Sequence, residues 1–141
     1  MAKVADPPIS DADFVWPVRV YWEDTDAGGV VYYANYLKFM ERARTEWLRA
    51  RGVVQSELEA KEGVVMVMRS INADYLAPAR LDDELDVTVS LANRKGASFS
   101  VNQQIWRRAD QTLLVRGSGE AACLDAKRWA PCRFPPLLRN L

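Results

Sequence analysis

Apolar residues recur along this chain with two different spacings, which separate helical segments from strands. Residues 35–51 carry an apolar side chain at every third or fourth position, the spacing that places side chains on one face of an α-helix. Gly52 follows directly, and glycine is favoured just after a helix end. The pattern predicts a long amphipathic helix over residues 35–51 and a short second helix over residues 55–62, ended by Gly63. The apolar stripe of the long helix is Tyr36, Phe39, Met40, Ala43, Trp47 and Ala50.

Alternation of apolar and polar positions predicts antiparallel strands on both sides of these helices. The strands are expected over residues 14–22, 64–77, 84–93, 98–107 and 112–125. Because one helix cannot cover both faces of such a sheet, the sheet is expected to curl around it. The fold class is therefore α+β, with a long central helix wrapped by a curved antiparallel sheet of about five strands.

A length of 141 residues suits one domain with a substantial core. We place that domain at residues 14–126, between a flexible N-terminal tail at 1–13 and an irregular C-terminal tail at 127–141 that holds three prolines. The N-terminal tail lacks the apolar centre of a signal peptide, and no apolar run has the length of a membrane span. The expectation is a soluble, cytoplasmic protein.

Charge and residue usage exclude several classes of function. Lys and Arg total 19, as do Asp and Glu, so no overall field attracts nucleic acid or an acidic membrane. The chain has no histidine, which excludes mechanisms that depend on imidazole. Its two cysteines, Cys123 and Cys132, are expected to be reduced thiols, with Cys123 in the core. They leave a zinc site short of ligands, so we expect no metal and no bound cofactor.

An acidic cluster lies between the first strand and the long helix. Residues 23–26 read Glu-Asp-Thr-Asp, and Gly28 and Gly29 follow. The start of a helix favours negative charge, and glycines let a ligand approach the backbone closely. A carboxylate beside free N–H groups suits attack on a carbonyl, because the N–H groups stabilise the oxyanion. The simpler interpretation is that Asp24, Thr25 and Asp26 cap the helix.

These residues resemble the opening of the hotdog-fold acyl-CoA thioesterases. The matching segment, residues 18–32, reads VRVYWEDTDAGGVVY, and further matches fall at residues 34–36, 41–46 and 75–83. The group associated with the Tol-Pal operon of bacteria is the most similar, and 4-hydroxybenzoyl-CoA thioesterase is a near relative. The resemblance spans about residues 16–125. It implies a hotdog fold and a dimer with one continuous sheet, often paired again into a tetramer.

The resemblance also implies roles for individual residues. Asp26 matches the catalytic carboxylate, which acts either as a nucleophile or as a general base for water. Tyr33 matches the position whose backbone N–H donates to the thioester oxygen. Many members of the Tol-Pal group have histidine there, whereas the hydroxybenzoyl enzyme has tyrosine, as this chain does. In the turn at residues 94–98, Arg94, Lys95 and Ser98 match the region that contacts the phosphates of coenzyme A, although such a turn is also often solvated surface.

The expected function is hydrolysis of an acyl-CoA, with an acyl carrier protein as a possible further partner. A hotdog dehydratase or hydratase acting on acyl thioesters is a competing class, but those enzymes pair histidine with a carboxylate. A non-catalytic module that binds acyl-CoA or an acyl carrier protein is the second alternative. The intact Asp26 favours the enzyme over this binding module.

Overall fold

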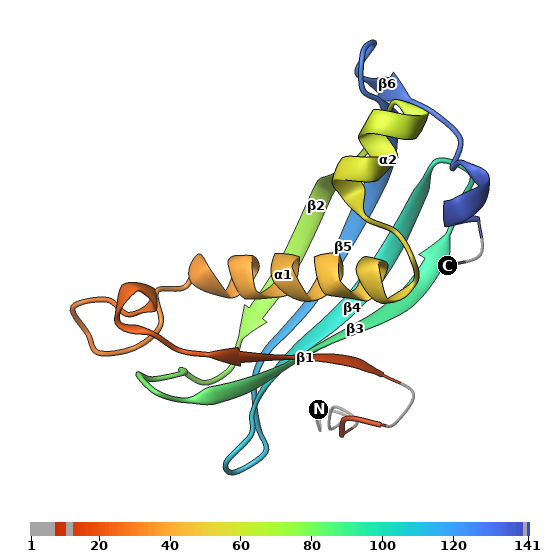
Figure 1. Cartoon of the computed structure of the whole chain (residues 1–141). Coiled ribbons are helices and arrows are strands. Elements are labelled where there is room, and N and C mark those ends of the chain that lie inside the picture. The colour runs from red at the N-terminus through yellow and green to blue at the C-terminus, as the bar shows by residue number, and fades with distance from the viewer. Residues whose placement is uncertain (1–7, 11–12, 140) are drawn as a thin grey trace.

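A curved antiparallel sheet wraps around one long helix in the computed structural model, which describes residues 8–10, 13–139 and 141 (Figure 1). The predicted fold class is therefore confirmed. In chain order the elements are β1 (Phe14–Arg19), the 3-10 turn η1 (Trp22–Asp24), α1 (Asn35–Ala50), α2 (Gln55–Glu62), β2 (Val64–Tyr75), β3 (Glu84–Arg94), β4 (Ser98–Arg107), β5 (Thr112–Asp125), β6 (Ala130–Pro131) and the 3-10 turn η2 (Pro136–Leu138).

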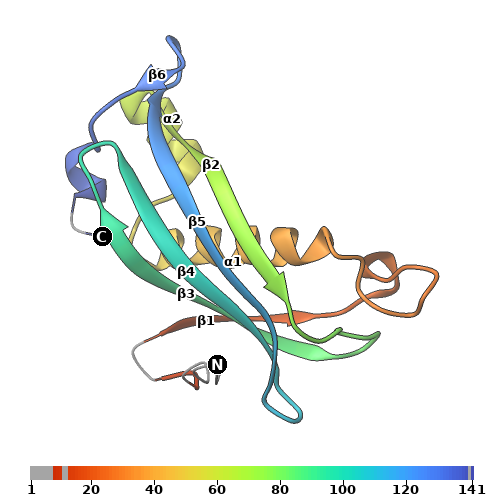
Figure 2. The ribbon, with the colours of Figure 1, turned by 180° about the vertical axis from the view of Figure 1, so that it is seen from behind.

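The main strands lie in the order β1-β3-β4-β5-β2, and every neighbouring pair is antiparallel (Figure 2). The short β6 pairs with the end of β5. Register shifts interrupt three of the pairings, and such bulges increase the local twist and bend of a sheet. They lie between Met68 and Ser70, Leu91 and Asn93, and Ile105 and Trp106. The order leaves β1 and β2 as the two edges.

The apolar face of α1 packs against the concave side of the sheet. Phe39, Met40 and Trp47 from the helix are among the largest fully buried side chains. Gly117 in β5 lies under the helix, where an added Cβ would come within 2.9 Å of Met40 Cε and 3.1 Å of the Asn72 carbonyl oxygen. Glycine at this position therefore lets the helix and the sheet approach closely.

Two of the sequence predictions about local structure were wrong. The first strand ends at Arg19, because the chain then turns into η1, where the Asp24 carboxylate accepts a hydrogen bond from the Tyr21 N–H (2.8 Å). The C-terminal tail is also more ordered than expected, since it contributes β6 and η2. Most of the predicted N-terminal tail, residues 1–7 and 11–12, lies outside the described residues. No helix in the described part of the chain is long and apolar enough to cross a membrane.

Both cysteines are free thiols, and their sulfur atoms lie 3.5 Å apart. Cys123 is buried in β5, so its predicted place in the core is confirmed. Burial, with a smaller contribution from the neighbouring Cys132, raises the pKa of the Cys123 thiol to about 12. A thiol with so high a pKa is a poor nucleophile at neutral pH, and Cys123 therefore serves packing.

Candidate active site

The segment between β1 and α1 folds into a tight loop that exposes Asp26. The Asp26 N–H donates to the Val30 carbonyl (2.9 Å), and the Gly29 N–H donates to the Asp26 carbonyl (3.0 Å). Asp26 Oδ1 in turn accepts a hydrogen bond from the Gly28 N–H (2.8 Å). Gly29 has a φ of +77°, a conformation that other residues rarely adopt. The backbone of the loop therefore fixes the Asp26 carboxylate while leaving it open to a ligand.

The start of α1 presents an N–H group that is free to bind a ligand. The N-cap residue is Ala34, and its side chain makes no capping hydrogen bond. The described residues give the Tyr33 N–H no hydrogen-bond acceptor. Burial raises the pKa of Tyr36, and the charge of Asp26 adds to this rise, so the carboxylate lies within electrostatic reach of the first helical turn. A carboxylate and an unpaired donor thus lie at the same helix end.

Helix capping by the acidic cluster, the simpler interpretation, was wrong. Asp24 is buried, and its carboxylate accepts a hydrogen bond from the Tyr21 N–H at the start of η1. The Thr25 hydroxyl donates to the Trp22 carbonyl (2.8 Å). The Asn35 side chain donates to the Asp24 carbonyl (2.9 Å), so it ties the loop to the helix. Of the three candidate caps, Asp26 alone leaves its carboxylate exposed beside the helix start.

Aromatic side chains surround this helix start. The Tyr33 ring lies 4.8 Å from the Tyr32 ring and 6.1 Å from the Tyr75 ring, measured between centroids. These three side chains are exposed to solvent. Exposed tyrosines are enriched at surfaces that bind a ligand or another protein. Tyr33 and Tyr75, together with Tyr36 and neighbouring apolar residues, line a shallow hollow of about 300 Å³. The Tyr33 side chain therefore belongs to an apolar surface next to the free N–H.

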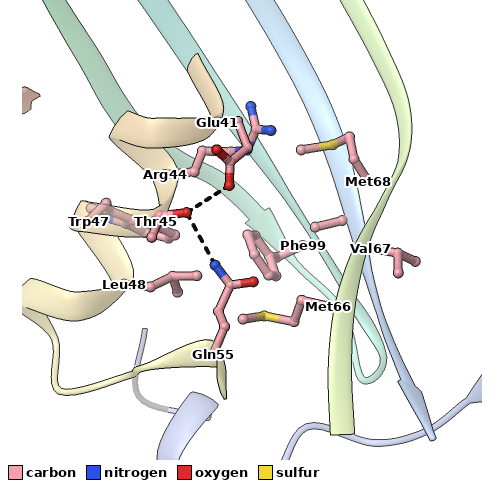
Figure 3. A pocket seen from close by; sticks show the side chains of 11 residues that line it. Glu41, Arg44, Thr45, Trp47, Leu48, Gln55, Met66, Val67, Met68 and Phe99 are labelled. Carbon is pink, nitrogen blue, oxygen red and sulfur yellow. Dashed lines mark hydrogen bonds between the residues drawn. The ribbon is translucent and has the colours of Figure 1, made fainter. Parts of the chain in front are cut away.

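A more enclosed cavity lies between the second half of α1, the start of α2 and the first half of β2 (Figure 3). Its volume is about 150 Å³. Along one side, the Thr45 hydroxyl donates to Glu41 Oε1 (2.9 Å) and accepts from Gln55 Nε2 (3.3 Å). Arg44 also lines the cavity, and burial lowers the pKa of its guanidinium. The apolar lining is Trp47, Leu48, Met66, Val67, Met68, Phe99 and Ala121.

Arg94 and Lys95 lie at a cluster of cations. With Arg133 and Arg139 from the C-terminal segment they line a hollow of about 490 Å³, and no carboxylate side chain of the described residues is in its lining. Arg94 Nη1 donates to the carbonyls of Arg139 and Leu141, so Arg94 holds the C-terminal segment. We call Arg94, Lys95, Arg133 and Arg139 the basic cluster.

The catalytic residues and the phosphate-binding residues predicted for the site do not meet within one chain. Ser98 is buried in β4 and does not line the hollow of the basic cluster. The loop that carries Asp26 lies at the N-terminal end of α1, whereas the turn between β3 and β4 and the C-terminal segment lie at its other end (Figure 1). A helix of 16 residues is about 24 Å long. One chain therefore keeps Asp26 and the basic cluster well apart.

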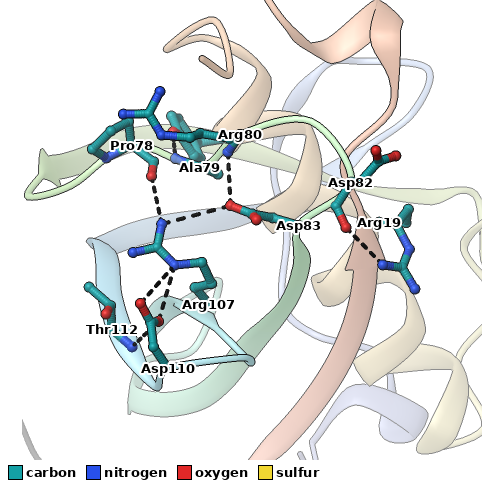
Figure 4. A network of polar contacts seen from close by, with 10 residues as sticks. Arg19, Pro78, Ala79, Arg80, Asp82, Asp83, Arg107, Asp110 and Thr112 are labelled. Carbon is teal, nitrogen blue, oxygen red and sulfur yellow. Dashed lines mark hydrogen bonds and ion pairs between the residues drawn. The ribbon is translucent and has the colours of Figure 1, made fainter. Parts of the chain in front are cut away.

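The sequence did not single out several residues that the structure brings to these sites. Arg133 and Arg139 reach the basic cluster from a tail that was expected to be irregular. Arg107 supports the turn at residues 78–83 behind the Asp26 loop (Figure 4). Each is one of many arginines in a turn or at a strand end, and only the tertiary contacts set them apart. Among the described residues, no group of three His, Cys, Asp or Glu side chains is arranged to hold a metal.

The family profile described as the thioesterase-like superfamily matches residues 20–140. The chain belongs to this superfamily. Among curated relatives, the acyl-CoA thioester hydrolase YbgC of Escherichia coli O6:H1 is 46% identical over 122 residues, which are 86% of this chain and 90% of that protein. The acyl-CoA thioesterase YbgC of Haemophilus influenzae is 42% identical over 89% of this chain and 90% of its own.

Solved structures of proteins named as thioesterases share the fold of this chain. A probable thioesterase from Bartonella henselae superposes with a TM-score of 0.83 at 34% identity, over 88% of this chain and all of that one. The 1,4-dihydroxy-2-naphthoyl-CoA thioesterase Slr0204 of Synechocystis has a TM-score of 0.85 at 22% identity, over 92% and 94% of the two chains, and so shares the fold. These comparisons confirm the resemblance to hotdog-fold acyl-CoA thioesterases. They also confirm the predicted hotdog fold and the assignment to thioester hydrolases.

The contact between Arg107 and Asp110 predicts a response to acid. Arg107 Nε donates to both Asp110 carboxylate oxygens (3.1 and 3.2 Å). These bonds, together with hydrogen bonds from Thr112, hold the pKa of Asp110 at about 2. The unfolded chain has a carboxyl pKa of about 3.9, so the contact stabilises the fold above that value and is lost as the pH falls through about 2. Urea unfolding at pH 5 and pH 2.5 should show that Asp110→Asn loses less stability on acidification than wild type.

The matched control is Asp82→Asn, because the Asp82 carboxylate makes no hydrogen bond or ion pair with the described residues. This variant should lose as much stability on acidification as wild type. Equal losses in wild type and Asp110→Asn would show that the contact contributes nothing to acid resistance.

Proposed function

We propose that this protein hydrolyses acyl-CoA thioesters at Asp26 and the start of α1. The observation that carries the proposal is an exposed carboxylate, fixed by its own loop, beside an unpaired N–H at Tyr33. The relatives named as acyl-CoA thioester hydrolases support the same chemistry. The non-catalytic binding module, by contrast, gives no reason for a carboxylate to be held at this helix end.

In the proposed reaction, the thioester oxygen accepts a hydrogen bond from the Tyr33 N–H. The helix dipole adds to this stabilisation as negative charge develops on the oxygen. Asp26 then either attacks the carbonyl carbon and displaces the coenzyme A thiolate, to form an anhydride that water opens, or removes a proton from a water that attacks the carbon and displaces the thiolate. In either route the thiolate leaves as the C–S bond breaks and then takes up a proton. Both routes consume one water and yield a free acid and the coenzyme A thiol. Neither route needs imidazole, which agrees with a chain without histidine.

The basic cluster is the proposed binding site for the phosphates of coenzyme A. Its cations gather around one hollow without a carboxylate side chain in the lining, which suits a ligand with several negative charges. Arg94 is engaged with the C-terminal segment, so Lys95 and Arg133 are the groups best placed to meet a ligand. Arg94 would then act by holding the segment that carries Arg133.

Two copies of the chain are needed to bring this phosphate site to Asp26. β2 is a free edge, and pairing it with β2 of a second copy about a two-fold axis would extend the sheet and cover unpaired backbone groups. Antiparallel pairing about the middle of β2 places the Tyr75 end of one copy beside the Val64 end of the other. The Asp26 loop lies near the Tyr75 end of β2, and the basic cluster lies at the end of the sheet where Val64 begins β2 (Figure 1). Each active site would then be shared, in a dimer or in a tetramer of two such dimers.

The same pairing suggests where the acyl group lies. The enclosed cavity beside Met66 and Met68 is near the Val64 end of β2, so it would adjoin Asp26 of the second copy (Figure 3). Its volume of about 150 Å³ equals that of a cavity known to hold benzene. The cavity therefore favours compact acyl groups, of roughly one aromatic ring or a few carbons, over long chains.

Asp26→Asn tests the proposed function directly. The change keeps the size of the side chain and an oxygen that can accept from Gly28, but removes the base or nucleophile. Turnover should fall by about two orders of magnitude or more, with little effect on folding. The measurement is steady-state release of free thiol from short-chain and aromatic acyl-CoA substrates. Glu23→Gln removes an exposed carboxylate from the same segment and should retain wild-type turnover, whereas activity of Asp26→Asn within about threefold of wild type would contradict the assignment.

The basic cluster makes a separate prediction about binding. The double variant Lys95→Ala/Arg133→Ala should raise KM with little change in kcat, because it removes contacts remote from the reacting carbonyl. The effect should shrink at high salt, since exposed charges are screened. Lys127→Ala/Arg128→Ala removes two exposed cations that do not line the hollow and serves as the control. Equal KM values for the two double variants would place the phosphates elsewhere.

A further inference from the structure

The turn at residues 78–83 is hydrogen-bonded both to the loop that carries Asp26 and to the first turn of α1. The Val31 N–H donates to the Ala79 carbonyl (2.9 Å), and the Ala79 N–H donates to the Tyr36 hydroxyl (3.0 Å). Val31 lies just before Tyr33 in the chain, and Tyr36 lies in the first turn of α1. Ala79 is fully buried, so it has no freedom to move without its neighbours. Its position therefore sets both the loop and the helix start.

Arg107 reaches this turn from the end of β4 (Figure 4). Its Nη1 donates to the Pro78 carbonyl (3.0 Å) and lies 3.7 Å from Asp83 Oδ2. The same carboxylate oxygen accepts a hydrogen bond from the Arg80 N–H (2.9 Å). The guanidinium therefore holds the backbone on both sides of Ala79, directly at Pro78 and through Asp83 at Arg80.

The environment of this contact distinguishes it from an ordinary surface ion pair. The side chains of Arg107 and Asp83 are 21% and 23% exposed, whereas those of the neighbouring Arg108 and its partner Glu84 are 45% and 38% exposed. Exposed pairs contribute little because water and salt screen them. A shielded guanidinium that also binds a backbone carbonyl fixes geometry more firmly. Arg107 is therefore placed to hold the 78–83 turn in one conformation.

We infer that Arg107 is a positioning residue for the thioester site, which it serves by holding the 78–83 turn and, through Ala79, the Tyr33 N–H relative to Asp26. The inference rests on the proposed function. Small misplacements of reacting groups reduce the rate strongly, so loss of the Arg107 contacts with Pro78 and Asp83 lowers kcat. Substrate affinity is largely spared, because neither Arg107 nor the 78–83 turn lines the basic cluster that is proposed to hold the phosphates.

Arg107→Met tests the inference, because it removes the guanidinium and keeps an unbranched apolar side chain. We expect kcat to fall about tenfold or more, with KM unchanged within about twofold. Amide hydrogen exchange over residues 31–36 should be faster in this variant. Arg108→Met is the matched control. It loses ion pairs with Glu84 and Asp86, but within the described part of the chain Arg108 makes no hydrogen bond or ion pair with the 78–83 turn, so the variant should retain wild-type kcat and exchange. Arg107→Lys keeps the charge without the planar fork and should give an intermediate kcat.

Two results would overturn the inference. The first is the same kcat for Arg107→Met and Arg108→Met. The second is a fall in kcat no larger than the loss of folded protein, measured by circular dichroism at the assay temperature. If Asp26→Asn is inactive while Arg107→Met equals its control, the proposed function stands and the positioning role does not. If Asp26→Asn is active, the proposed function itself fails.

Discussion

The packing of α1 into the concave face of the sheet sets the position of every part of the candidate site. Phe39 and Trp47 anchor the helix in the core, and Gly117 leaves room for Met40 at the point of closest approach. With the helix fixed at this depth, its first turn lies where the Asp26 loop and the 78–83 turn meet. The chemistry proposed at Asp26 therefore depends on a buried contact made by core residues of α1 and β5.

The same helix separates the reacting group from the charges that would bind coenzyme A. Its length keeps the Asp26 loop and the basic cluster at opposite ends of one chain. The free edge at β2 would resolve this separation, because the proposed antiparallel pairing with a second copy would bring opposite ends together. An edge strand with unpaired backbone groups also favours such an association. In this account, pairing at the β2 edge both forms the dimer and completes the active site.

Periodicity alone predicted most of the fold, because the apolar patterns of this chain agree with its local structure. The bounds of α2, β4 and β5 match the expected ranges, and α1 differs only at its last residue. The first strand was predicted too long, since the apolar run continues into η1, whose turn depends on the Asp24 carboxylate. Asp26 was recognisable as a candidate site residue from its motif and from its place before a helix. Arg107 was not, because its role arises from contacts with Pro78 and Asp83, which are distant in the sequence.

A shared active site is the central claim, and mixing two defective variants tests it most directly. One chain carries Asp26→Asn and the other carries Lys95→Ala/Arg133→Ala; they are mixed under conditions that exchange subunits and assayed at low substrate concentration. In a mixed dimer with shared sites, one site has both defects and the other has none. The account predicts that activity rises above that of either variant alone, toward roughly a quarter of the wild-type value when chains pair at random in equal amounts. Activity that stays at the average of the two variants after exchange would show that each site lies within one chain, and would contradict the account.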